Sequence, residues 1–216
     1  PTDLIAYGAL RIHAESSRLE ELDLAAGQFH LVVARFEIEN HVDVVVDGYV
    51  RSDARLPLVV VGSAPYANEY TERINALADD RVRLVGGLWD QELLDQLYGN
   101  ALVYYHGHSV GGTNPSLLRA IGAGAAVDAF DVSFNREVLG DAGRYWSTAE
   151  DVRALVESAE ADPVAQADRG RLSRDRAALY DWDEVADRYE ELCRRLALEG
   201  PVRHRPSGRR TGAFPA

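Results

Sequence analysis

Five short runs of apolar residues, rich in β-branched and aromatic side chains, mark the first two thirds of the chain. They lie at residues 29–36, 58–61, 82–85, 101–105 and 125–130. Near-continuous apolar runs, rather than runs that alternate with polar residues, are typical of strands buried on both faces. A helical pattern follows each run, so the sequence predicts a doubly wound, mainly parallel α/β sheet of the Rossmann-like type.

Helices are predicted between these runs and after the last of them. Amphipathic patterns cover residues 39–50 and 68–77, Asp90 is a good N-cap for a helix to Tyr98, and another helix starts at Pro115. Ser147 and Glu150 have the three-residue spacing of a capping box, which predicts a further helix start. Two more helical stretches cover residues 165–180 and 183–198.

These patterns divide the chain into three parts. Residues 29–198 form the predicted Rossmann-like domain, and residues 1–28 are expected to be a lead-in or an interdomain segment. The end of the chain, residues 199–216, is rich in Arg, Pro and Gly and has no periodicity, so we expect it to be disordered.

Composition and charge argue against several classes of protein, including nucleic-acid binders and membrane-spanning proteins. The chain has 216 residues and a net charge of -12, which argues against a nucleic-acid ligand. No apolar segment is long enough to span a membrane and no secretory signal opens the chain, so the expected location is cytoplasmic. The single Cys193 can form neither an intrachain disulfide nor a zinc site.

A glycine-rich loop follows the fourth predicted strand, in "HGHSVGGTNPSLLRAIGAG". Asn114 is a favoured N-cap and Pro115 suits the first helical position. Gly111 and Gly112 would let a ligand approach backbone N–H groups at the helix start, where the helix dipole favours an anion such as a diphosphate. An ordinary turn with a good cap is the alternative.

A family resemblance extends from about residue 29 to about residue 198. The segment "GGTNPSLLRAIGAGAAVDAFDVSFNREVLGDAG" resembles the donor-site segment of the group 1 family of retaining nucleotide-sugar glycosyltransferases, which have the GT-B fold. It is most similar to the rhamnosyltransferase-like branch. "VVARFEIENHVDVVVDGYV" and "LVVVGSAP" resemble the first and second strands of the same family, and the motifs come in the expected order.

The resemblance implies that this chain is half of an enzyme. A GT-B protein has two Rossmann-like domains with the active site between them. The C-terminal domain, which this chain resembles, binds the nucleotide diphosphate sugar, and the missing N-terminal domain binds the saccharide or glycoconjugate acceptor. The expected activity is a hexosyltransferase-like reaction in polysaccharide or glycoconjugate synthesis. Neither a cofactor nor a metal is expected.

The resemblance also implies roles for individual residues. Arg35, after the first strand, would stabilise the departing diphosphate as the catalytic residue; a surface ion pair with Glu37 or Glu39 is its alternative. Residues 86–88 would line the nucleobase pocket, unless they form an ordinary turn. The residues assigned to donor binding are His108, Gly111, Gly112, Thr113, Asn114, Ser116, Leu117, Arg119, Gly86, Leu88 and Glu137.

Two positions depart from the family pattern. Many relatives have a glutamate at the place of Arg119, where it accepts hydrogen bonds from ribose hydroxyls, and arginine can only donate. Asn40 stands where a basic partner of Arg35 is common. His106 and His108 alternate as on a strand end, but two histidines rarely make a metal site. Glu137 could approach the donor sugar or cap its own short helix.

Three functions remain open from the sequence. The first is the donor-binding domain of a retaining glycosyltransferase. The second is a degenerate domain that binds nucleotide weakly or serves as an interaction partner, for which Arg119 and Asn40 argue. The third is a sugar-nucleotide epimerase of GT-B shape or a dinucleotide oxidoreductase; the oxidoreductase is disfavoured because no G-x-G-x-x-G follows the first strand.

Overall fold

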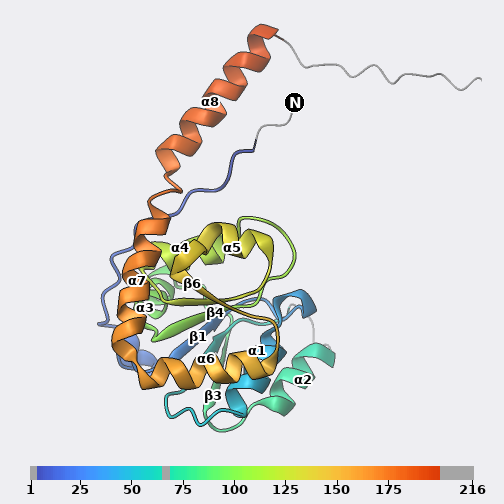
Figure 1. Ribbon diagram of the computed structural model, residues 1–216, viewed down its shortest axis with the longest axis vertical. Coiled ribbons are helices and arrows are strands. Elements are labelled where there is room, and N and C mark those ends of the chain that lie inside the picture. Colours follow the sequence, from blue (N-terminus) through green and yellow to red (C-terminus); the bar gives the residue numbers. More distant parts are fainter. Residues whose placement is uncertain (1–3, 65–68, 200–216) are drawn as a thin grey trace, which may run out of the picture.

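The protein is a layered α/β structure built on one parallel sheet (Figure 1). The computed structural model describes residues 4–64 and 69–199. The six strands lie in the order β3-β2-β1-β4-β5-β6, and every neighbouring pair is parallel. The strands are β1 His30–Val33, β2 Leu58–Val61, β3 Val82–Gly86, β4 Val103–His106, β5 Val127–Phe130 and β6 Gly143–Trp146.

Helices cover both faces of the sheet. The α-helices are α1 Val42–Val50, α2 Glu69–Leu77, α3 Gln91–Asn100, α4 Pro115–Ala123, α5 Ser133–Leu139, α6 Ala149–Ala161, α7 Pro163–Ala177 and α8 Trp182–Glu199. Short 3-10 helices cover Leu19–Leu22, Ile38–Asn40 and Gly140–Ala142. The predicted doubly wound, mainly parallel fold is therefore confirmed.

Two buried clusters, one on each side of the sheet, explain why most strand residues are apolar. One cluster joins the sheet to α3, α4, α5 and α7. The other joins it to α1, α2 and α6. Successive strand residues such as Val59 and Val60 belong to opposite clusters, as the two-residue period of a strand requires.

The first predicted strand ends earlier than the sequence pattern suggests. β1 ends at Val33 although the apolar run continues to Phe36. The backbone N–H of Ala34 still bonds the carbonyl of Val61 at 3.0 Å, and the chain then turns out of the sheet. Ala34 and Arg35 consequently belong to a loop at the carboxyl end of the sheet.

The prediction missed β6 and misplaced the cap of α6. Tyr145 and Trp146 pair with β5, and α6 begins at Ala149, one residue later than a Ser147 cap would place it. Thr148 is the N-cap, and its side chain accepts a hydrogen bond from Asp151 N at 3.2 Å. The Asp151 carboxylate accepts one from Thr148 N at 2.9 Å, which completes the capping box.

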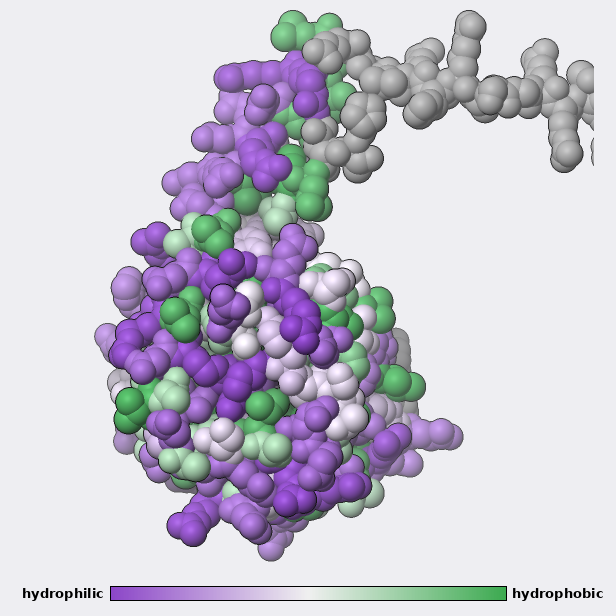
Figure 2. Space-filling model, in the orientation of Figure 1, coloured by the Kyte–Doolittle hydropathy of each residue, from purple (hydrophilic) through white to green (hydrophobic). Residues whose placement is uncertain are grey.

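The last helix leaves the body of the domain. In Figure 1, α8 extends away from the sheet, with the N-terminal segment running beside its first part. Arg188 donates to the Leu4 carbonyl at 2.6 Å, and Ala9 N donates to the Tyr180 carbonyl at 2.6 Å. Figure 2 shows hydrophobic residues along one flank of α8 and hydrophilic residues along the other. Of the predicted disordered tail only Glu199, the end of α8, lies within the described residues.

Candidate functional site

A cleft of about 310 Å³ opens where four strands of the sheet end. In open α/β sheets, ligands bind outside the carboxyl ends of the strands, near the point where the strand order reverses. Here β1 lies between β2 and β4, so the reversal falls at the centre of the cleft. The cleft is lined by Val33, Ala34, Arg35, Val61, Gly62, Ser63, Gly87, Leu88, Trp89, His108, Asn114, Pro115 and Ser116.

The wall of the cleft depends on a close approach between two loops. A Cβ atom at Gly62 would collide with the carbonyl oxygen of Ala34, so only glycine fits where the β1 and β2 loops meet. In the glycine-rich loop, Gly111 has a φ of +123°, which other residues rarely adopt. Added Cβ atoms at Gly111 and Gly112 would meet open space, so backbone conformation rather than packing favours glycine at Gly111.

Helix α4 begins at the cleft as the sequence predicts. Asn114 is the N-cap, with φ -92° and ψ 127°, and Pro115 follows at the first helical position. The Asn114 side-chain oxygen accepts from Ser116 N at 2.9 Å and from Ser116 Oγ at 2.8 Å. A ligand anion at this helix start would share the Ser116 amide with the cap, whereas the Leu117 side chain is fully buried in the core.

Two stacked imidazoles lie behind the helix start. The His106 and His108 rings are 4.4 Å apart at an angle of 11°, and the Tyr104 hydroxyl lies 3.0 Å from His106 Nδ1. Burial lowers the pKa of His106 well below its ordinary value. Burial, and after it the charge of Arg35, lowers the pKa of His108 to about 4. Both rings are therefore neutral near pH 7.

Arg35 gives the cleft its charge. Asn40 is buried, and its amide donates to the Arg35 carbonyl at 2.8 Å, which fixes the loop. Within residues 4–64 and 69–199, no ion pair joins Arg35 to Glu37 or Glu39. Among the described lining residues, Arg35 carries the only permanent charge and none is an Asp or Glu.

Arg119 lies outside the lining of the cleft. Its Nε donates to Asp95 at 2.6 Å, its Nη2 donates to the Gln91 carbonyl at 2.9 Å, and its Nη1 donates to the Gln91 side chain. All three bonds join α4 to α3. The side chain is thus held by groups of the neighbouring helix rather than turned into the cleft.

The predicted site residues fall into two groups, those that line the cleft and those that do not. Arg35, Leu88, His108, Asn114 and Ser116 come together in its lining. The predicted residues outside the lining are Gly86, Gly111, Gly112, Thr113, Leu117, Arg119 and Glu137.

Glu137 does not cap its helix. It lies within α5, whose N-cap is Val132 with no side-chain capping bond. Its backbone carbonyl instead accepts a hydrogen bond from Arg176 of α7.

Sequence reasoning missed Ser63 and Trp89 as lining residues. Each follows a strand end at a glycine, and Trp89 is 88% exposed. Ser63 could have been found by extending the strand-end argument to the second predicted strand, and Trp89 by extending the predicted lining of residues 86–88 by one residue.

The described residues contain neither a candidate metal cluster nor a candidate membrane span. No cluster of three or more His, Cys, Asp or Glu side chains within them could hold a metal ion. None of the helices described is both long and apolar enough to cross a membrane.

A known protein with a similar sequence is a subunit of an N-acetylglucosaminyltransferase. A curated relative is the GtfA subunit of UDP-N-acetylglucosamine–peptide N-acetylglucosaminyltransferase from Streptococcus parasanguinis. It is 24% identical over an alignment 178 residues long, which covers 76% of this chain and 34% of the relative. The chain therefore spans about a third of that protein's length.

Solved structures agree on the fold. Sucrose-phosphate synthase from Thermosynechococcus elongatus aligns with a TM-score of 0.80 and 23% identity, over 91% of this chain and 53% of the synthase. HepE from Anabaena, in complex with UDP, aligns with a TM-score of 0.72 and 16% identity, over 83% of this chain and 52% of HepE. Pneumococcal GtfA, in complex with UDP and GlcNAc, aligns at 0.68 and 18% identity, over 88% of this chain and 39% of GtfA.

The family itself is shown by the sequence. The family model "Glycosyl transferases group 1" matches residues 24–161, which include all six strands and every residue lining the cleft. The chain belongs to the group 1 glycosyltransferase family.

Proposed function

We propose that this chain is the donor-binding half of a retaining glycosyltransferase. Its cleft would bind a nucleoside diphosphate sugar, and the whole enzyme would transfer a hexose or deoxyhexose to a saccharide or glycoconjugate. The observation that carries the proposal is the composition of the cleft. The Arg35 guanidinium, which makes no ion pair within the described residues, and a helix N-terminus converge there without a carboxylate among the described lining residues.

That composition stands out against the rest of the chain. The protein has 35 Asp and Glu against 23 basic residues, so a ligand-sized surface without acid is unusual in it. Backbone N–H groups at the start of α4 and the helix dipole favour negative charge there. A nucleoside diphosphate combines such an anion with an apolar base, which matches the apolar wall of Val33, Val61 and Leu88.

Ligands of the structural relatives support this proposal. HepE has been solved with UDP, with UDP and glucose, and with UDP-glucose. Because this chain covers about half of HepE, the acceptor site is proposed to lie on the part that has no counterpart here.

In the proposed reaction, an acceptor hydroxyl attacks the anomeric carbon as the bond from that carbon to the nucleoside diphosphate breaks on the same face, and the hydroxyl proton passes to an oxygen of the leaving diphosphate. Negative charge then grows on the bridging oxygen of the diphosphate. Arg35 and the amides at the start of α4 would stabilise that charge in place, which is the contribution to catalysis expected of preorganised donors. His108 is a neutral hydrogen-bonding group beside them.

Replacing Arg35 with alanine should weaken the binding of the preferred nucleoside diphosphate by about 10- to 30-fold, because a charge-assisted hydrogen bond is lost. Calorimetry with UDP, TDP, GDP and ADP, alone and as their sugar conjugates, measures this. Arg51→Ala is the control, since Arg51 pairs with Asp47 at 2.7 Å on α1, away from the cleft.

The same titration separates the proposal from its rival, a degenerate non-catalytic domain. The hydrogen bonds of Arg119 to α3, outside the cleft, favour that rival. At this position the family resemblance implies a glutamate that binds the ribose, and Arg119 is instead held by the neighbouring helix. Heat from none of the nucleotides at millimolar concentration would reject the donor-site proposal and support the degenerate domain.

Diphosphate binding should also take up protons in mild acid. An anion beside His108 favours the charged imidazole, so the pKa of His108 rises from about 4 on binding. We expect proton uptake near pH 5 and none near pH 8. Calorimetry at each pH in two buffers of different ionisation enthalpy measures it, and His108→Gln should abolish it. Equal uptake by this variant would contradict the assignment to His108.

A further inference from the structure

A second hollow adjoins the cleft on the other side of Pro115. It has a volume of about 500 Å³ and lies between the N-terminal segment, α3, α4 and the start of α8. Pro115 lines both this hollow and the cleft. A third hollow of about 490 Å³ continues along α3 and shares Leu10 and Asp95 with the second. We call the second and third hollows together the side groove.

Two aromatic rings form the wall of the side groove nearest α8. Tyr7 is 56% exposed and Trp182 is 43% exposed, and both line the hollow. The Trp182 ring packs so closely on Gly8 that a Cβ there would lie 2.5 Å from it. Rings of this size that stay exposed in a concave site are typical of ligand contacts.

Hydrogen bonds hold the segment that carries Tyr7 and Leu10. Ala9 N donates to the Tyr180 carbonyl at 2.6 Å, and Ile12 N donates to the Gly122 carbonyl at 3.0 Å. These bonds join the N-terminal segment to the ends of α7 and α4. The side groove is therefore formed before any ligand binds.

The polar side of the groove combines hydrogen-bond donors and acceptors and has more carboxylates than guanidiniums. Arg119 and Asp95 neutralise each other at 2.6 Å, and Gln91 bonds the same guanidinium. The remaining N–H groups of Arg119 can donate, and the Asp95 and Gln91 oxygens have further lone pairs. In the third hollow, Gln96 adds an amide, and Arg11 lies among the carboxylates of Glu15, Glu92 and Asp95. The excess of carboxylates disfavours a phosphate ligand.

We propose that the side groove binds a neutral oligosaccharide. Sugar hydroxyls both donate and accept, which suits paired planar groups such as Arg119, Asp95 and Gln91, and the apolar faces of sugar rings suit Tyr7 and Trp182. An anion would meet more carboxylates than guanidiniums, and a purely apolar ligand would leave the polar side unpaired. Because the groove meets the cleft at Pro115, a glycan in it lies next to the proposed donor site, on this half of the enzyme.

The proposal is tested on the whole chain with maltohexaose, cellohexaose and mannohexaose as probes, by calorimetry and by amide chemical shifts. We expect at least one of them to bind and to shift residues of the groove. Tyr7→Ala should weaken that binding by about 5- to 10-fold, the effect of one aromatic contact. Tyr189→Ala is the matched control, since Tyr189 is 51% exposed on α8 and lines no part of the groove.

Further variants separate this proposal from that of the donor site. Arg35→Ala should leave saccharide binding unchanged, because Arg35 lines only the cleft. Asp95→Asn, which keeps the side-chain shape, should weaken saccharide binding more than nucleotide binding. The proposal is overturned if none of the three saccharides binds at millimolar concentration, or if Tyr7→Ala and Tyr189→Ala behave alike. Nucleotide binding by the unmodified chain would survive either result.

Discussion

Replacement of Asp128 with alanine should lower the free energy of unfolding by about 3–5 kcal/mol, the usual cost of removing one partner from a buried ion cluster. Asp128 lies on β5 and is 0% exposed. Its carboxylate accepts from Arg144 Nη2 at 2.8 Å and from Arg169 Nη2 at 2.7 Å. The variant would leave two guanidiniums, on β6 and α7, without their counterion in a largely buried site.

Urea unfolding followed by tryptophan fluorescence measures this effect, since Trp146 is buried and its ring N–H donates to the Asp128 carbonyl at 3.2 Å. Asp131→Ala is the control. Asp131 pairs with Arg136 on the surface, and this pair should contribute no more than about 1 kcal/mol. Equal losses in the two variants would show that the buried cluster contributes nothing beyond a surface pair.

The same cluster explains why one strand could not be predicted. The sequence "GRYW" of β6 places an arginine in the middle of a strand and has no apolar run. Its register on β5 places Arg144 opposite Asp128, a pairing across 16 positions of the chain that no local pattern reveals. β1, β2, β4 and β5 were predictable because burial on both faces favours a near-continuous apolar run. β3, at the edge of the sheet, alternates in burial and was predictable from its three apolar residues in spite of Arg83.

The candidate site was predictable where it depends on local sequence. A loop after a strand and a capped helix start are short-range features, and the residues they single out include Arg35, Asn114 and Ser116, which line one cleft in the structure. The direction of the Arg119 side chain was not predictable, because it depends on Asp95 of another helix. Its inward or outward orientation is decided by tertiary packing.

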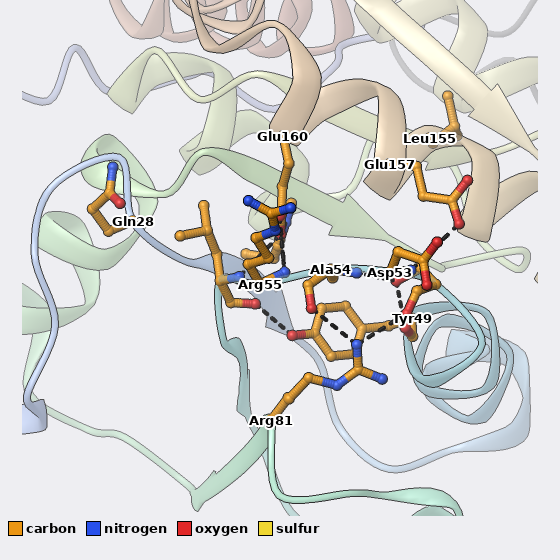
Figure 3. A network of polar contacts seen from close by, with 12 residues as sticks. Gln28, Tyr49, Asp53, Ala54, Arg55, Arg81, Leu155, Glu157 and Glu160 are labelled. Atoms are coloured by element: carbon orange, nitrogen blue, oxygen red, sulfur yellow. Dashed lines mark hydrogen bonds and ion pairs between the residues drawn. The ribbon is translucent and has the colours of Figure 1, made fainter.

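Replacement of Glu160 with alanine should lower the free energy of unfolding by about 2–3 kcal/mol, because it leaves several hydrogen-bond donors without an acceptor. Figure 3 shows Glu160 reaching from α6 to the turn that carries Arg55. Its carboxylate accepts from Arg55 N at 2.9 Å and from Leu56 N at 3.1 Å. His30, fully buried on β1, has its Nε2 3.1 Å from the same carboxylate.

The contribution of Glu160 should depend on pH. Burial alone would raise the pKa of its carboxyl, but the hydrogen bonds from His30 and from the backbone of Arg55 and Leu56 outweigh burial and lower that pKa. A carboxyl whose pKa is lower in the folded state stabilises the fold above its unfolded pKa. The stabilisation is lost as the pH falls through the folded pKa, so the difference between Glu160→Ala and the unmodified chain should shrink in acid.

Urea unfolding at pH 7 and at several acidic pH values tests both parts of this prediction. Glu157→Ala is the matched control on the same helix, one turn earlier. Glu157 pairs with Arg153 at 3.0 Å near the surface, so its loss should cost no more than about 1 kcal/mol. A Glu160→Ala effect that persists unchanged in acid would assign the loss to packing rather than to the carboxylate. If Glu160→Ala and Glu157→Ala lower the free energy of unfolding equally at pH 7, water replaces the missing carboxylate as the hydrogen-bond acceptor. The sheet beside His30 would then be open enough to admit that water.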